Sequence, residues 1–235
     1  MGDLLSVFQH ETLLLDGALG TELERRGADT TSAGWTSKAI VDHPELIAQI
    51  HREYIDAGAR IITANTFRTN PRAHKKGKHS AEELTKRAIE LARNAVASSG
   101  RSNLFVAASI APANDSLSLQ HAEIDDKELR AEHGLMAKWI EESGADLILI
   151  ETMNTVREAF IALTAARQNS RLPIAVSLVP ASRTQLMSGA ALIDSLELLA
   201  KAGADILMLN CQALSIVSPM LREFGSICKG LGKRW

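Results

Sequence analysis

Six residues with polar or thiol side chains follow short apolar runs at intervals along the chain, and together they could bind a small zwitterion. They are two carboxylates, two amides, a hydroxyl and a thiol: Asp16, Asn65, Ser109, Glu151, Asn210 and Cys211. Carboxylates can pair with the ammonium group of such a ligand, while amides and hydroxyls can hold its carboxylate. The thiol is a candidate nucleophile or metal ligand. The set therefore predicts a site for a molecule that resembles an amino acid.

Each of these residues also has a purely structural interpretation. Asp16 could cap a following helix, and Glu151 could pair with a neighbouring arginine. Asn65 and Asn210 could satisfy loop backbone, and Cys211 could be a small buried apolar side chain. The prediction of a site depends on all of them occupying equivalent positions at strand ends.

Three segments that resemble one another would place these residues. They are EYIDAGARIITANT from Glu53, WIEESGADLILIET from Trp139 and LLAKAGADILMLNC from Leu198. Each reads as the end of an amphipathic helix, a glycine, an apolar strand and then a polar residue. The glycine can take the left-handed conformation that ends a helix. The strands are apolar at nearly every position, as expected when both faces of a parallel sheet are buried.

Further strands and helices alternate between these segments. Apolar runs predict strands at 12–16, 104–109 and 173–178, and helical periodicity appears at 44–57, 81–98, 126–143, 155–169 and 191–202. The order predicts one α/β domain over residues 1–235, with six parallel strands and right-handed crossovers. The carboxyl ends of such strands meet at one edge, where ligands bind.

Two architectures fit this alternation. A doubly wound sheet usually carries a phosphate loop, but neither G-x-G-x-x-G nor G-x-x-x-x-G-K-[ST] follows the first strand. A TIM (β/α)8 barrel needs eight strands and about 250 residues. The repeats favour a TIM (β/α)8-type barrel that is incomplete, with about six βα units and without the last two.

Composition excludes several classes of protein. The 235 residues are 46% hydrophobic, the net charge is -2 and the isoelectric point is about 6.4, so neither nucleic acid nor an anionic membrane is an expected partner. Two cysteines are too few for a disulfide scaffold. No apolar run reaches the roughly 20 residues that span a bilayer, and the N-terminus is not typical of a secretory signal. We expect a cytoplasmic protein; its oligomeric state has no signal in the sequence.

The motifs resemble those of the homocysteine S-methyltransferase family. LLLDGALGTELERRG, followed by HPELIAQIHREYIDAGARIITANTF, is similar to the family's opening. VAASIAPANDS resembles its third-strand motif, DLILIETM its fourth and GADILMLNC its sixth. The resemblance runs from about Leu13 to Cys211, and its opening motif and the Asn-Cys pair are specific in combination.

The resemblance implies a (β/α)8 barrel that binds homocysteine and zinc at the carboxyl ends of its strands. It places Asp16 and Glu151 near the homocysteine amino group and makes Cys211 the first of three cysteine ligands to zinc. A free thiol has a pKa near 8.5, so little thiolate exists at neutral pH. Zinc would deprotonate the homocysteine thiol and orient it for attack on a methyl donor.

The chain departs from the family pattern at the other two zinc ligands. They form an adjacent Cys-Cys pair in the family, and no such pair occurs here. Cys228 is isolated and expected on the helix after the sixth strand, and every histidine lies at or before His133. One thiolate cannot hold zinc in a site that needs three protein ligands. Zinc is thus expected for the family, while stable zinc binding by this chain is not.

The expected function is transfer of a methyl group from a small donor, such as S-methylmethionine or S-adenosylmethionine, to homocysteine, which gives methionine. The alternative is a catalytically inactive, truncated homologue that binds a small amino acid or acts as a regulatory fragment. An aldolase or lyase is disfavoured because no lysine follows a strand to form a Schiff base. Enzymes that use betaine or methylfolate share these motifs, so the sequence leaves the donor open.

Overall fold

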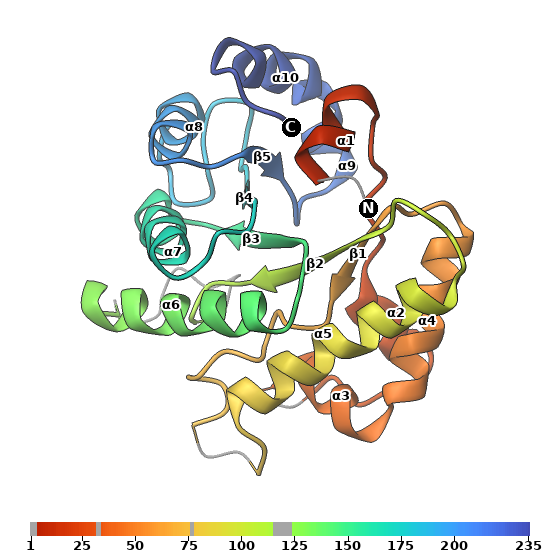
Figure 1. Ribbon diagram of the computed structural model, residues 1–235. Helices are drawn as coiled ribbons and strands as arrows, with labels where there is room; N and C mark the ends of the chain where they lie inside the picture. Colours follow the sequence, from red (N-terminus) through yellow and green to blue (C-terminus); the bar gives the residue numbers. More distant parts are fainter. Residues whose placement is uncertain (1–3, 32–33, 76–77, 115–123) are drawn as a thin grey trace. The chain divides into compact units, whose positions relative to one another are not determined.

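Strands and helices alternate along the chain in the computed structural model (Figure 1), which describes residues 4–31, 34–75, 78–114 and 124–235. The strands form one sheet in the order β1-β2-β3-β4-β5, with β1 parallel to β2 and β4 parallel to β5. This confirms the predicted α/β class. The strands are β1 (Ile61–Ala64), β2 (Phe105–Ile110), β3 (Leu147–Met153), β4 (Ile174–Leu178) and β5 (Ile206–Leu209).

The long helices lie close to their predicted positions. They are α4 (Pro44–Asp56), α5 (Ala81–Ser98), α6 (Asp126–Glu142), α7 (Val156–Asn169) and α8 (Leu192–Lys201). Ser80 and Thr155 cap α5 and α7, because their hydroxyls accept the backbone N–H groups of Glu83 and Glu158. The shorter helices are α1 (Leu4–His10), α2 (Leu19–Arg25), η1 (Trp35–Lys38), α3 (Ala39–Asp42), α9 (Leu214–Val217), η2 (Ser218–Met220) and α10 (Leu221–Gly230), which carries Cys228 as expected.

The three glycines of the repeated segments end their helices as predicted. Gly58, Gly144 and Gly203 have φ angles of 107°, 72° and 101°, in the region that favours glycine. The strands that follow are mostly buried, and every residue of β2 and β4 is buried. Burial on both faces explains why these strands lack alternation of polar and apolar residues.

The prediction of a strand at 12–16 is corrected to an isolated parallel bridge between Leu15 and Ile61. Asp16 N–H donates to the Ile61 carbonyl at 3.0 Å, so pairing begins as expected. The ladder then stops because the Asp16 side chain accepts the N–H of Thr63 at 2.8 Å. A side-chain acceptor thus replaces the next backbone acceptor, and the six predicted strands become five strands and a bridge.

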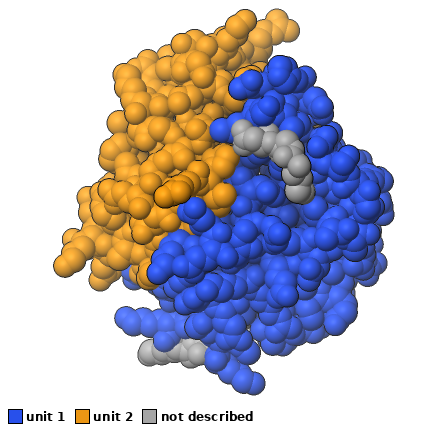
Figure 2. Space-filling model, viewed as in Figure 1, with its two compact units in different colours: residues 1–109, 138–148 blue, residues 110–137, 149–235 orange. Residues whose placement is uncertain are grey.

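The chain divides into two compact units, residues 1–109 with 138–148 and residues 110–137 with 149–235, here called unit 1 and unit 2 (Figure 2). In unit 1, α2 to α5 enclose an apolar cluster of Leu23, Ala28, Ala39, Ile40, Ile47, Ile50, Leu84 and Ala88. In unit 2, Leu129 of α6 and Ile161 of α7 pack with Ala113. The prediction of a single domain remains a prediction.

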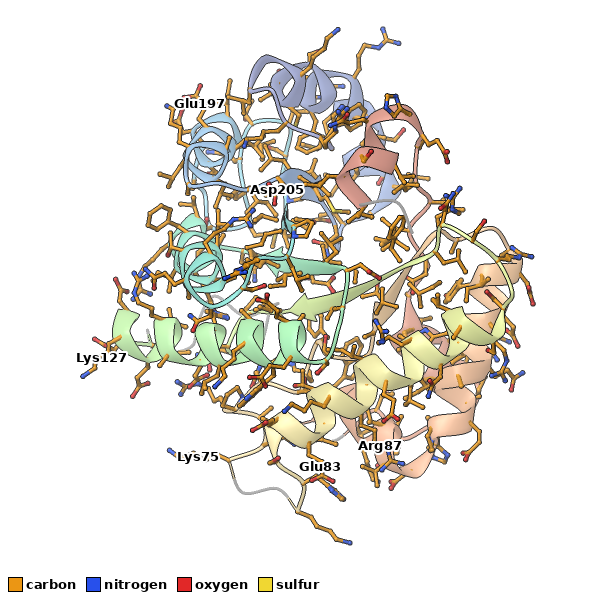
Figure 3. All side chains as sticks on the ribbon, viewed as in Figure 1. Lys75, Glu83, Arg87, Lys127, Glu197 and Asp205 are labelled. Atoms are coloured by element: carbon orange, nitrogen blue, oxygen red, sulfur yellow. The ribbon has the colours of Figure 1, made fainter. Side chains whose placement is uncertain are left out.

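In both units, an aspartate carboxylate accepts a backbone N–H at the start of a strand. In unit 1, the Asp146 carboxylate accepts the N–H of Val106 at 2.8 Å, at the start of β2. In unit 2, the carboxylate of Asp205, labelled in Figure 3, accepts the N–H of Ile174 at 2.8 Å, at the start of β4. Arg167 pairs with that carboxylate. These contacts explain the aspartate of the repeated Gly-Ala-Asp sequence.

His51 is a buried polar residue in α4 of unit 1. Its side chain is fully buried, and neither ring nitrogen has a hydrogen-bond partner among the described residues. Burial lowers the pKa of His51 from 6.5 to about 4, because the charged ring would lose its hydration. The ring is therefore neutral in the folded protein at neutral pH.

Among the described residues, no helix has both the length and the apolar content that crossing a bilayer requires.

Candidate functional site

Unit 2 brings together three of the predicted site residues, Glu151, Asn210 and Cys211. Glu151 lies near the end of β3, while Asn210 and Cys211 directly follow β5. Thr152 of β3 and Ser177 of β4 join them through hydrogen bonds. These five residues are here called the Asn210 group, and their positions confirm that the ends of these strands carry a polar cluster.

The amide of Asn210 is the centre of the Asn210 group. Its Nδ2 donates to the Glu151 carboxylate at 2.9 Å and to Thr152 Oγ1 at 3.0 Å. Its Oδ1 accepts the N–H of Thr152 at 3.1 Å and the hydroxyl of Ser177 at 2.9 Å. The side chain thus bonds with three other side chains and one backbone N–H, which goes beyond the expected structural role of satisfying a loop.

Cys211 is solvent-exposed, so the interpretation as a buried apolar side chain is wrong. Its sulfur lies 3.3 Å from Thr152 Oγ1. Partial burial of the sulfur raises the pKa of the Cys211 thiol; the Thr152 hydrogen bond lowers it, and the Glu151 carboxylate raises it further. At neutral pH the thiol is therefore protonated when no metal is bound, and it is a poor nucleophile by itself.

Unit 1 holds the other three predicted residues, Asp16, Asn65 and Ser109. Asp16 is the acidic residue among them. Its carboxylate accepts the N–H of Thr63 at 2.8 Å and the Thr63 hydroxyl at 2.7 Å, so it fastens β1 and caps no helix. Burial raises the pKa of Asp16 to about 6, although the hydrogen bonds from Thr63 lower it. A carboxylate held this way is ionised at pH 7 and can receive an ammonium group.

Asn65 and Ser109 have structural partners in unit 1. Asn65 Nδ2 donates to the Thr36 carbonyl at 2.9 Å, and its Oδ1 accepts the Thr36 hydroxyl at 2.7 Å. Asn65 is buried, and the backbone carbonyl that it binds belongs to η1. Ser109 is also buried, and its carbonyl accepts the Thr66 hydroxyl at 2.9 Å. That all six residues share one rim remains a prediction.

Sequence reasoning missed two threonines that hold the predicted residues, Thr36 and Thr63. Thr63 carries a weak signal, since it is a polar residue inside an otherwise apolar strand. Thr152 was placed at the end of a predicted strand, directly after Glu151, but its contact with Asn210, 58 residues away, has no signal in the sequence. Its neighbours in sequence do not reveal that contact.

The part of the chain that the structure describes brings few potential metal ligands close together. No group of three or more histidine, cysteine, aspartate or glutamate side chains there could hold a metal ion. Cys211 therefore offers a single thiolate, whereas a zinc site needs three or four protein ligands. The described residues do not fit a complete zinc site.

Comparisons with known proteins converge on one family. A sequence model described as homocysteine S-methyltransferase matches residues 13–232, a segment that contains all six predicted site residues. The chain is 29% identical over 233 residues to homocysteine S-methyltransferase of Escherichia coli strain K12, covering 92% of this chain and 74% of that protein. It is 33% identical over 165 residues to homocysteine S-methyltransferase YbgG of Bacillus subtilis strain 168, covering 63% and 52%, so the match spans about half of that relative.

A solved structure has the same fold. The metallated form of the homocysteine methyltransferase MmuM from Escherichia coli superposes with a TM-score of 0.85 at 24% identity, covering 99% of this chain and 93% of that one. The likeness confirms the predicted barrel-type α/β fold.

Proposed function

Because the chain belongs to the homocysteine S-methyltransferase family, we propose that it binds homocysteine and acts in methyl transfer from a small donor to the homocysteine sulfur, giving methionine. The observation that carries this proposal is the Asn210 group. It joins a carboxylate and a thiol from two strand ends, and homocysteine offers an ammonium group that the carboxylate can bind. The donor belongs to a class of small methylated molecules, such as S-methylmethionine or S-adenosylmethionine.

The residues of the proposed site have different roles in binding. The Glu151 carboxylate receives the ammonium group, since Asn210 holds one of its oxygens at 2.9 Å and so fixes its direction. Asn210 supports Glu151 through this hydrogen bond. Asp16, in unit 1, is a second carboxylate that can receive an ammonium group.

Replacing Glu151 tests the binding role. We expect Glu151→Gln to weaken homocysteine binding at least tenfold, because the amide keeps the shape of the side chain but loses its charge. Isothermal titration at pH 7.5 measures the change. Glu197→Gln removes a half-buried carboxylate of α8 that pairs with Lys201, elsewhere in unit 2, and should leave the affinity unchanged. Equal affinities of the Glu151 variant and the parent chain would refute the assignment.

The Asn210 group has a single thiol, and this supports a second candidate function, homocysteine binding without methyl transfer. One thiolate falls short of the three protein ligands that a catalytic zinc site needs, and no described group of three or more ligands could hold a metal ion. Homocysteine binding with no methionine formed from S-methylmethionine would favour this candidate.

Metal analysis tests whether this chain holds zinc by itself. We expect the purified 235-residue chain, after gel filtration with excess zinc, to retain well below one zinc ion per chain, because the described residues offer too few ligands. Plasma mass spectrometry measures the content, and the Cys211→Ser variant gives the background. One tightly held zinc per chain, lost in the Cys211 variant, would contradict the expectation.

A further inference from the structure

Two residues of the Asn210 group have backbone conformations that their side chains disfavour. Thr152 has a φ angle of 60° and Cys211 one of 52°, both in the left-handed region. For a β-branched residue such as threonine this conformation is a rare outlier. Such strain persists only where surrounding contacts impose it, and it concentrates at functional sites.

Contacts from Asn210 hold Thr152 in this conformation. The Thr152 N–H donates to Asn210 Oδ1, and Thr152 Oγ1 accepts from Asn210 Nδ2. The orientation of the amide is fixed by Glu151, because an ionised carboxylate is only an acceptor and must face the NH2 group. Both backbone and side chain of Thr152 are therefore locked.

The same contacts leave the Thr152 hydroxyl able to donate to Cys211. Since Thr152 Oγ1 accepts a hydrogen from Asn210, its own hydrogen is available for another acceptor, and the Cys211 sulfur lies 3.3 Å away. A chain of hydrogen bonds thus runs from Asn210 through Thr152 to Cys211. Hydrogen bonds linked in this way strengthen one another.

We propose that Thr152 is a positioning residue whose hydroxyl holds the Cys211 sulfur in a fixed direction at the end of β5. The contact orients the Cys211 sulfur for methyl transfer to homocysteine, and this part of the proposal rests on the proposed function. Glycine would occupy the left-handed position without strain. Threonine in this conformation lowers the stability of the fold. The need for its hydroxyl beside Cys211 explains why threonine occupies the position.

The S–H stretching band in Raman spectra reports the hydrogen bonding of the Cys211 thiol directly. In a Cys228→Ala background, Cys211 is the single thiol of the chain. We expect Thr152→Val to move the band to the position of a thiol without this donor, while Thr152→Ser keeps the parent position. Ser177→Ala, which removes a contact of Asn210 but none of Thr152, is the matched control and should leave the band in place.

Thr152→Gly guards against a variant that fails to fold. It removes the hydroxyl and also relieves the backbone strain, so we expect it to fold and to show the same band shift as Thr152→Val. A band that stays at the parent position in both the Val and Gly variants would overturn the proposal. A Ser variant that shifts as far as the Val variant would also overturn it.

Methionine formation tests the purpose separately. If the parent chain forms methionine, Thr152→Val should lower kcat at least tenfold and change the homocysteine KM less than twofold, and Thr152→Ser should restore kcat to within threefold. An unchanged kcat in the Val variant would refute the catalytic purpose. If the parent chain forms none, the proposed methyl transfer fails, while the thiol band still decides whether Thr152 positions Cys211.

Discussion

Replacing Asn210 by aspartate should lower the free energy of unfolding by about 3 kcal/mol at pH 7. The variant keeps the size of the side chain and an oxygen that can accept from Thr152 N–H and the Ser177 hydroxyl. It loses the Nδ2 donor to Glu151 and Thr152, however, and puts a second carboxylate where the amide lies 2.9 Å from the Glu151 oxygen. A lost charge-assisted hydrogen bond and a like-charge contact both oppose folding.

Urea unfolding followed by circular dichroism measures this loss. Gln212→Glu is a matched control, since it makes the same change from amide to carboxylate two residues later. The Gln212 side chain contacts the Met187 sulfur at 3.5 Å and the N–H of Ala213, so we expect a change below about 0.5 kcal/mol. A loss under about 1 kcal/mol in the Asn210 variant would show that the Asn210 group is not cooperative.

The second large effect concerns His51. Its folded pKa of about 4 lies below the unfolded value of 6.5, so the unfolded chain takes up a proton at a higher pH than the folded chain does. The contribution of neutral His51 to stability is complete above pH 6.5 and is lost as the pH falls from 6.5 to 4. The full loss corresponds to about 3 kcal/mol.

His51→Leu should abolish this loss. We expect the stability of the variant relative to the parent chain to rise by about 3 kcal/mol between pH 7 and pH 4. Asp16 acts in the opposite direction, since its folded pKa of about 6 exceeds the ordinary 3.8 and its protonation favours folding as the pH falls through this range. That term is common to both proteins and cancels in the difference.

Denaturant titrations at half-unit pH steps measure the difference. His43, an exposed residue directly before the same helix, provides the control His43→Gln, which should follow the parent curve. A difference between the Leu variant and the parent that stays constant with pH would show that His51 takes up its proton as easily in the folded chain as in the unfolded one.

Local signals in the sequence predicted most of the fold. The helices over residues 44–56 and 81–98 were found from periodicity, because a helix repeats its apolar face every three or four residues. The glycines Gly58, Gly144 and Gly203 marked helix ends because their φ angles favour glycine. The segment 12–16 has the composition of a strand, but a contact with Thr63, distant in sequence, ends its ladder.

The candidate site was predicted only in part, for a similar reason. The rule that ligands lie at strand ends selected Glu151, Asn210 and Cys211, which the structure brings together. It also placed Thr152 at a strand end, but it could not show the left-handed backbone of Thr152 or its contact with Asn210. Nor could it show that Asn65 is occupied by Thr36. Contacts between strand ends depend on register, which a single sequence does not specify residue by residue.

The hydrogen bond from the start of β4 to Asp205, just before β5, affects how such a site can evolve. Asp205 binds the start of β4, while Asn210, just after β5, is the centre of the proposed site. The contact that holds β5 to β4 and the proposed site thus lie at opposite ends of one short strand. Mutations at the reactive end can then explore new ligands while the anchored end keeps the sheet in register. Substitutions in the proposed site therefore leave the contact that holds the sheet intact. A site built from the same residues as that contact would not have this freedom.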